Sequence, residues 1–429
     1  MRSIVINDHW VETQIKAFCK IRRSSFMVDC PLKAISPDYE AWRDCAQCVS
    51  NKLICTETSF FGSYDLCNLQ KCLQVSLRNV DWLLHLSGKR YRDHASHQLF
   101  VSVLGWFLLN CVVDSKISDG KEQTLKQWIA DHGNPSLRVE EVELAWWIMG
   151  LLHDHAYPLS HVLRMPISLA GGKARGDFLE QIWALLGQGS ERYCANGAIA
   201  GVYSDTLLRD LYQVVLLDSD EKRRVAIYKK LTEYLSPFFP ETQELPREDD
   251  KGNQLSCYDH GILGAANLAA WSPEAAHNNH ILQTVIRAVA IHNGAACHKN
   301  VNAQKDPLAF LLILCDELQE WGRRILVEDG IVCESQKIRL ENLEKVKPGT
   351  YKLTDELAVI FEYLPRILKK TGWDFSQFER SKEIAFKRLY IPNGFPIKKI
   401  TYQIPHLDPT RSIDFKKIQE STSDLATRS

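Results

Sequence analysis

The sequence lacks an excess of charge of either sign. Its 429 residues include 52 lysines and arginines against 53 aspartates and glutamates, which gives a formal net charge of −1 at pH 7. A strongly basic chain is typical of proteins that bind nucleic acid or anionic membranes through overall electrostatic attraction. Because the charges nearly balance, net charge gives no reason to expect duplex nucleic acid or an anionic membrane as a partner.

The sequence also lacks a long uninterrupted apolar run. The longest apolar stretch, residues 99–113, contains Ser102, Gly105 and Asn110, and it is shorter than the roughly 18 residues that a membrane-spanning helix needs. The first ten residues, MRSIVINDHW, do not have the basic and then apolar layout of a secretory signal. The sequence therefore predicts a soluble protein in the cytoplasm, without a membrane partner.

Cysteines, by contrast, are plentiful. Thirteen of them in a chain without a signal-like start indicate a reducing compartment, where free thiols or metal ligands are expected in place of disulfides. One hypothesis is a closed structural zinc site made of Cys45, Cys48, Cys67 and Cys72. The alternative, which the loose spacing of the last two favours, is that these are buried thiols that behave as small apolar residues.

Composition and periodicity divide the chain into three segments. Residues 1–75 are cysteine-rich and weakly periodic, residues 76–330 are mainly helical in pattern, and residues 331–429 mix strand-like and helix-like stretches before a polar tail. An insertion at about residues 165–256 interrupts the helical segment and ends in a polar stretch rich in helix breakers. We therefore expect a mainly α protein, a helical bundle with a small α+β appendage at its C-terminal end.

Apolar periodicity predicts the helices of the central segment. Pro307 suits a first helical turn and Asp259 suits a helix N-cap. In the C-terminal segment, residues 356–364 fit a strand or a short helix, whereas residues 398–404 alternate like a strand. The expected helices cover residues 97–113, 139–154, 219–235, 260–271, 280–293 and 307–326.

Histidine and aspartate interrupt these apolar helices. The pair His153 and Asp154 follows a run that includes Trp146, Met149 and Leu152, where a carboxylate is costly unless a positive group neutralises it. That group can be a lysine or arginine, or a metal ion. A lone histidine on such a helix is more often a hydrogen-bonded core residue, but several helices that each supply one such residue are typical of a metal site in a helical bundle. The other residues of this kind are His97, His260, His292 and Asp316.

The order His97, then His153 and Asp154, then Asp316 resembles the HD superfamily of metal-dependent phosphohydrolases, which is named after its adjacent histidine and aspartate. The strings LLHD, DHGILGA and DPLAFLLILCDELQEWGR look like segments of uncharacterised bacterial HD-domain proteins. The resemblance covers about residues 76–330. It implies an HD-type helical bundle and an enzyme.

The resemblance further implies a centre of one or two metal ions. In members with two ions, Asp154 would bridge both of them, and His260 and His292 would complete the ligand set of the second ion. Imidazole together with carboxylate suits Mn, Fe, Ni, Co or Zn, with Mg as an alternative. A paired site lowers the pKa of a bridging water and clamps phosphoryl oxygens, so a catalytic role is expected for Asp154 as well. The implied ligands of the first ion are His97, His153, Asp154 and Asp316.

Other polar residues near the motif are candidates for handling protons or phosphate. His94 shares a helix face with His97, so it can orient water or replace His97 as the ligand. The alternatives are that His155 and His161 face solvent and that the basic residues belong to a solvated turn. The candidate acids, bases or water-orienting groups are His94, His155 and His161, and the candidate substrate-binding residues are Lys89, Arg92 and Tyr157.

The residues that follow His153 and Asp154 give information on the substrate. The stretch HDHAYPLSH, residues 153–161, is nearest to the pattern of deoxynucleotide triphosphohydrolases, with Tyr157 where a catalytic histidine is expected and one residue fewer before His161. The signatures of cyclic di-nucleotide hydrolases and guanosine tetraphosphate hydrolases are missing. We therefore expect hydrolysis of a phosphate ester or anhydride in a nucleotide or another phosphorylated small molecule.

Two alternatives stay open. One is a phosphodiesterase that acts on a cyclic or oligomeric nucleotide. The other is a catalytically silent HD domain that serves as a nucleotide sensor or scaffold in a stress-response or phage-defence assembly, because ligands alone do not prove turnover. The partners considered beyond the small molecule are further copies of the chain and proteins of such a defence complex.

Overall fold

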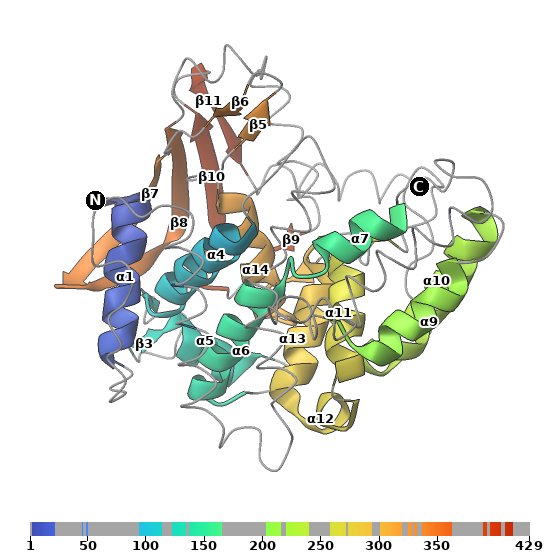
Figure 1. The fold of residues 1–429 in the computed structure, drawn as a ribbon. Coiled ribbons are helices and arrows are strands. Elements are labelled where there is room, and N and C mark those ends of the chain that lie inside the picture. Colours follow the sequence, from blue (N-terminus) through green and yellow to red (C-terminus); the bar gives the residue numbers. More distant parts are fainter. Residues whose placement is uncertain are drawn as a thin grey trace, which may run out of the picture. The chain divides into compact units, whose positions relative to one another are not determined.

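The described part of the protein is mainly helical and also contains a sheet (Figure 1). Within it, every helix is too short or too polar to cross a membrane. The computed structural model describes residues 2–21, 45, 49, 94–113, 122–133, 137–164, 203–215, 220–239, 258–271, 273–293, 301–319, 325–327, 330–332, 337–362, 389–392, 395–404 and 408–414.

The chain divides into two compact units. The sheet unit consists of Met1–Arg23, Phe100–Trp146 and Lys299–Ser429, and the helical unit consists of Ser24–Leu99 and Trp147–His298. Each unit combines segments that are far apart in the sequence. The helices α4 (His94–Leu109) and α6 (Val139–Leu152) cross the division.

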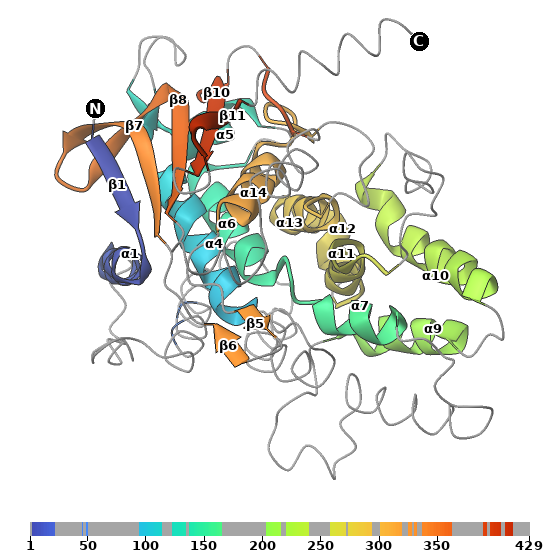
Figure 2. The ribbon, with the colours of Figure 1, turned by 90° about the horizontal axis from the view of Figure 1, so that it is seen from above.

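The sheet unit is built on a seven-stranded sheet with the central order β1-β7-β8-β10-β11, to which β2 and β3 add at β8. The pairs β1–β7 and β7–β8 are antiparallel, whereas β8 and β10 are parallel. Figure 2 shows β1 at the edge of this sheet, beside β7. The strands are β1 (Arg2–Ile6), β2 (Val112–Val113), β3 (Gln123–Thr124), β7 (Lys337–Lys347), β8 (Thr350–Glu362), β10 (Lys399–Ile404) and β11 (Asp408–Asp414).

This sheet is larger than an appendage made of the C-terminal segment alone. The first strand of the chain, β1, covers the open edge of β7, since an edge strand has unpaired backbone groups that a further strand can satisfy. Strand β8 decides the ambiguity of residues 356–364 in favour of a strand as far as Glu362, and β10 confirms the strand expected at residues 398–404. Four further short strands occur among the described residues: β4 (Val301–Asn302), which pairs with β9 (Leu389–Tyr390), and the hairpin β5 (Ile325–Val327) with β6 (Gly330–Val332).

Within the sheet unit, α4 and α6 are joined by the indole of Trp146. Its Nε1 donates a hydrogen bond to the carbonyl oxygen of Ser102 at 2.7 Å. Gly105 makes room for the ring, because a Cβ at that position would lie 1.8 Å from Cζ2 of Trp146. The remaining helices of this unit are α1 (Asp8–Ile21), α5 (Leu125–His132) and α14 (Pro307–Leu318).

The expected helices form, but two of them are shorter than their apolar runs. Helix α4 ends at Leu109, and Val112–Val113 is strand β2. Helix α14 begins at Pro307 as expected and ends at Leu318, where Gln319 leaves the helical conformation with ψ 83°. Apolar periodicity alone cannot locate the end of α4, because the buried residues of β2 continue the same apolar pattern.

The helical unit packs around α11 (His260–Trp271), which is buried along nearly its whole length, and α13 (His280–Ile291) lies against it. Asp259 caps α11 as expected, since its Oδ1 accepts hydrogen bonds from the backbone of Gly261 at 2.8 Å and of Ile262 at 3.1 Å. The other elements of this unit are α7 (Tyr157–Arg164), α9 (Asp205–Val215), α10 (Asp220–Leu235), the short 3₁₀ helix η5 (Ser236–Phe238) and α12 (Pro273–Asn278).

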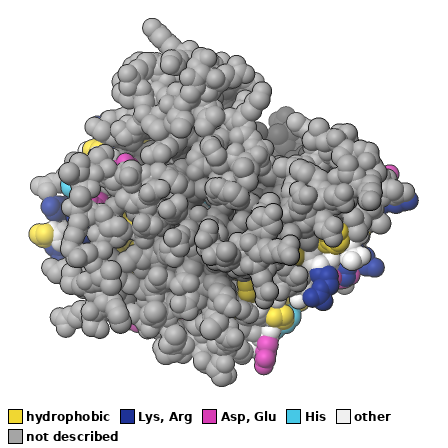
Figure 3. All heavy atoms as spheres, in the orientation of Figure 1, with side chains coloured by type: hydrophobic (Ala, Val, Ile, Leu, Met, Phe, Trp, Pro, Cys, Tyr) yellow, Lys and Arg dark blue, Asp and Glu magenta, His cyan; other side chains and the backbone are white. Residues whose placement is uncertain are grey.

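Basic side chains gather over α9 and α10 in the space-filling view (Figure 3). The exposed residues of α10 include Lys222 and Lys229, but also Glu221 and Glu233, and Lys230 pairs with Glu233 at 3.1 Å. Charges of both signs therefore alternate on this helix, as on an ordinary solvated surface.

Candidate metal centre

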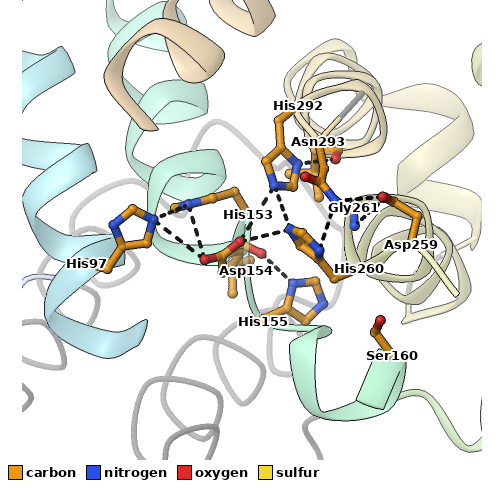
Figure 4. A network of polar contacts seen from close by, with 12 residues as sticks. His97, His153, Asp154, His155, Ser160, Asp259, His260, Gly261, His292 and Asn293 are labelled. Carbon is orange, nitrogen blue, oxygen red and sulfur yellow. Dashed lines mark hydrogen bonds and ion pairs between the residues drawn. The ribbon is translucent and has the colours of Figure 1, made fainter. Parts of the chain in front are cut away.

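Five buried polar side chains converge in the helical unit (Figure 4). His97 lies in the first turn of α4, His153 and Asp154 follow the last residue of α6, His260 begins α11, and His292 follows α13. None of the five is more than 8% exposed. Apolar helices thus carry polar ligands into the interior at their ends, where the backbone leaves the helix and side chains of several helices can meet.

The first half of the centre comprises His97, His153 and one carboxylate oxygen of Asp154. Nε2 of His97 lies 3.3 Å from Nε2 of His153. Oδ2 of Asp154 lies 3.6 Å from Nε2 of His97 and 3.7 Å from Nε2 of His153. Ligands about 2.1 Å from one ion in tetrahedral or octahedral geometry are about 3–3.5 Å apart, so these atoms are close to the separations of a metal site.

The second half comprises the other oxygen of Asp154 together with His260 and His292. Oδ1 of Asp154 lies 3.1 Å from Nε2 of His260 and 3.6 Å from Nε2 of His292. The two imidazole Nε2 atoms are 3.2 Å apart. Asp154 is the residue that the two halves share, and each of its oxygens faces a different pair of imidazoles.

Backbone hydrogen bonds fix the ring state of two of the histidines. Nδ1 of His153 lies 2.9 Å from the carbonyl oxygen of Gly150, and Nδ1 of His292 lies 2.6 Å from that of Val289. A carbonyl oxygen only accepts, so Nδ1 carries the hydrogen in both rings. When the rings are neutral, their Nε2 lone pairs point into the centre, which is the state that a metal ligand requires.

His260 has a different neighbour, which the sequence did not single out. Nδ2 of Asn293 lies 3.1 Å from Nδ1 of His260, and it donates to Oδ2 of Asp259 at 2.6 Å. Asn293 directly follows His292, so proximity to a ligand in the sequence was the one signal available. On the other face, the ring of Tyr157 stacks on His260, with ring centroids 4.0 Å apart and planes 26° apart.

His155 is completely buried beside the centre, and both of its ring nitrogens are engaged. Nδ1 donates to the carbonyl oxygen of Leu152, and Nε2 accepts from Nδ2 of Asn267 at 3.1 Å. Burial lowers the pKa of His155 from 6.5 to about 4. This arrangement favours a neutral ring that holds the turn after α6 against α11, so a role in proton transfer for His155 stays a prediction.

The structure does not test the roles expected for the remaining site residues. Asp316 belongs to the sheet unit, where it is half-buried on α14, and it is a member of neither half of the centre, so its role as a ligand stays a prediction. His94 and His161 lie on α4 and α7, but their side chains are not among those described. The calls that fall outside the described residues concern Lys89, Arg92, Cys48, Cys67 and Cys72.

The described cysteines do not add a second centre. Cys45 is buried, and none of the described residues groups with it into a set of metal ligands. Cys111 and Cys315 are buried free thiols, and burial raises the pKa of both. The structural zinc site stays a prediction, because the other three cysteines proposed for it lie outside the described residues.

No model of a known protein family matches the sequence, and searches of curated proteins and of solved structures give no significant match. What the structure does show is a buried group of four histidines and one aspartate that is compatible with an HD-like metal site.

Proposed function

We propose that the protein is an HD-type metal-dependent phosphohydrolase that cleaves a phosphate ester or anhydride in a nucleotide. The observation that carries this proposal is the carboxylate of Asp154, whose two oxygens face two different imidazole pairs at 3.1–3.7 Å. Paired metal sites of this kind recur in enzymes that hydrolyse phosphates.

The donor set fits metal ions better than it fits a purely structural role. Four imidazoles around one buried carboxylate bring the Nε2 atoms of two histidine pairs to 3.3 and 3.2 Å of each other. In His153 and His292 these atoms carry lone pairs when the ring is neutral, and each faces an oxygen of the Asp154 carboxylate, at 3.7 and 3.6 Å, without a hydrogen between them. A cation at these positions relieves the repulsion. A mixture of imidazole and carboxylate is the ligand set preferred by Mn, Fe, Co, Ni and Zn.

Each part of the chain has a separate task in this proposal. His97, His153 and Asp154 would hold one ion, and Asp154, His260 and His292 would hold a second. When bound, such ions supply a water of lowered pKa and positive charge for the phosphoryl oxygens. The chain itself positions the donors: His155 fixes the turn that carries Asp154, and Tyr157 limits the movement of the His260 ring.

The nucleotide as substrate rests on the sequence, through the likeness of HDHAYPLSH to the motif of deoxynucleotide triphosphohydrolases. Tyr157 was expected to contact the substrate, and it is half-buried with its ring on His260. Since part of this side chain is exposed next to a proposed ligand, it stays our candidate for a contact with the substrate.

The test combines metal analysis with a substrate panel. The purified protein is assayed with nucleoside and deoxynucleoside triphosphates, cyclic dinucleotides, short oligonucleotides and bis-p-nitrophenyl phosphate, each with Mn, Mg, Co, Ni or Zn. We expect release of phosphate, pyrophosphate or triphosphate, and its loss in Asp154→Ala. The control is His280→Ala, which changes an exposed histidine of α13 in the same unit.

The other outcomes discriminate between the alternatives. Cleavage of the cyclic dinucleotides or oligonucleotides alone would indicate a phosphodiesterase. Stoichiometric metal without turnover of any substrate would favour a nucleotide sensor or scaffold. A protein that binds no divalent metal, and that no divalent metal activates, would contradict the centre itself.

A further inference from the structure

Among the histidines of the centre, His260 differs from His153 and His292 in the group that lies behind its ring. Behind His153 and His292 there is a backbone carbonyl oxygen, which selects the hydrogen on Nδ1 and the lone pair on Nε2. Behind His260 there is the amide nitrogen of Asn293, 3.1 Å from Nδ1. A carbonyl oxygen and an amide NH₂ group demand opposite ring states, so the identity of the Asn293 atom decides what His260 can do.

Asp259 fixes the orientation of the Asn293 amide. The atom that approaches His260 also lies 2.6 Å from Oδ2 of Asp259. If the amide were turned over, its oxygen would face a carboxylate oxygen at that distance without a hydrogen between them, which is repulsive. Asp259 itself is the cap of α11 and accepts two backbone hydrogen bonds with its other oxygen, so the position of its side chain is fixed. The NH₂ group of Asn293 must therefore point at Asp259 and His260.

This orientation determines the hydrogen of His260. One hydrogen of the NH₂ group goes to Asp259 and the other goes to Nδ1 of His260, which must then accept. A neutral His260 therefore carries its hydrogen on Nε2, and from there it can donate to Oδ1 of Asp154 at 3.1 Å. An Nε2 atom that carries a hydrogen has no lone pair for a metal ion.

We propose that Asn293 makes the second half of the centre a conditional metal site. The first half binds its ion directly, whereas the second half is closed by the hydrogen bond from His260 to Asp154 until Asn293 turns its amide away and the hydrogen moves to Nδ1. Asn293 is exposed, so its side chain is able to rotate without repacking the core. This inference rests on the proposed function, and it adds a mode of regulation: the number of ions, and with it the activity, follows the supply of metal.

The direction in which Asn293→Ala changes metal affinity distinguishes this proposal from the usual role of a residue that hydrogen-bonds to a metal ligand. A group that orients a histidine ligand strengthens metal binding, and its loss weakens affinity by about 10–100-fold. We expect the opposite for Asn293→Ala, because the substitution removes the hydrogen bond that holds His260 in the wrong state. The dissociation constant of the second ion should fall about fivefold, while that of the first ion stays the same.

The experiment is a titration of the metal-free protein with Mn²⁺ or Co²⁺, measured by calorimetry and by equilibrium dialysis. The wild type should give two dissociation constants, and Asn293→Ala should lower the larger one. Asn278→Ala, at an exposed asparagine of α12, is the matched control and should change neither. An unchanged or larger second constant in Asn293→Ala overturns the conditional site and leaves the proposed function standing.

A second readout does not depend on metal affinity. In the metal-free protein, ¹⁵N spectra of labelled histidines should show His260 with its hydrogen on Nε2, and His153 and His292 with theirs on Nδ1. A hydrogen on Nδ1 of His260 in the metal-free state overturns the conditional site alone. Absence of any bound metal, by contrast, overturns the proposed function and the conditional site together.

Discussion

Asn267 and His155 are joined by a hydrogen bond of 3.1 Å between Nδ2 and Nε2, across 112 positions of the sequence. The same asparagine accepts a hydrogen bond from the backbone nitrogen of Ser204 at 2.7 Å, and the phenol of Tyr203 donates to the carbonyl oxygen of His155 at 2.9 Å. Helix α11, the turn that carries Asp154 and the residues just before α9 are thus connected through His155 and Asn267. The connection is structural, and it lies directly beside the proposed ligands.

The first prediction concerns this connection. Asn267→Ala leaves His155 and the backbone of Ser204 without their buried partner, so it should lower the free energy of unfolding by about 1–3 kcal/mol. Metal affinity should fall as well, because the turn with Asp154 loses its tie to α11. Urea unfolding measures the first effect and calorimetry the second. Asn278→Ala is the control, and a stability equal to that of the control would mean that the hydrogen bond contributes nothing.

The second prediction separates the two halves of the centre. His292→Ala should remove one ion and keep the ion held by His97, His153 and Asp154, whereas His153→Ala should abolish the tighter binding step. Metal content after dialysis, measured by mass spectrometry, gives the stoichiometry of each variant. His280→Ala serves as the exposed histidine control. Equal loss in both variants would show that the halves do not bind independently.

The third prediction concerns Asp316, the one implied ligand that lies in the sheet unit. If it ligates a metal, Asp316→Asn should weaken metal binding and leave the stability of the chelated protein unchanged or raised, because the half-buried negative charge that the ion balances is removed. If Asp316 instead pairs with a buried cation, the substitution should cost roughly 3–5 kcal/mol with or without metal. Denaturant unfolding with chelator and with excess metal distinguishes these cases.

The fourth prediction follows from the buried thiols. A raised pKa keeps Cys111 and Cys315 protonated at pH 8, and only the thiolate reacts with alkylating reagents. Both should therefore stay unlabelled by iodoacetamide in the folded protein and become labelled in urea. Mass spectrometry of the peptides provides the measurement. Rapid labelling of either thiol without urea would show that the structure around it opens locally.

The sequence was sufficient to identify the four histidines and the aspartate that meet in the centre, because each stands at the end of an apolar helix. The pattern is local, since a charged group after Leu151 and Leu152 is already conspicuous in one dimension. It could not predict that Asn267 and Asn293 contact His155 and His260. Only the packing of α11 against the turn after α6 shows that Asn267 reaches His155, and only its packing against α13 shows that Asn293 reaches His260.

The fold was predictable in its helices and less so in its sheet. A strand such as β8 carries enough alternation to be recognised as one alternative, but its partners are not encoded locally. The pairing of Arg2–Ile6 with residues of β7 more than 300 positions later depends on edge compatibility, which no local pattern reveals. Asp316 shows the same limit, because its position in an apolar helix fits the pattern of a ligand and no local pattern tells which residues it contacts, so its role stays a prediction.

Two glycines of α11 restrict how the helix can change over evolutionary time. A Cβ on Gly261 would lie 2.7 Å from the carbonyl oxygen of Val289, and one on Gly264 would lie 2.9 Å from Cε1 of His155. Sliding α11 by one residue would bring larger side chains to both places, so the helix has a single register along α13. Two glycines, which have no side chain, therefore fix how far His260 reaches into the centre. Descendants of this chain that keep the centre should rarely replace either glycine.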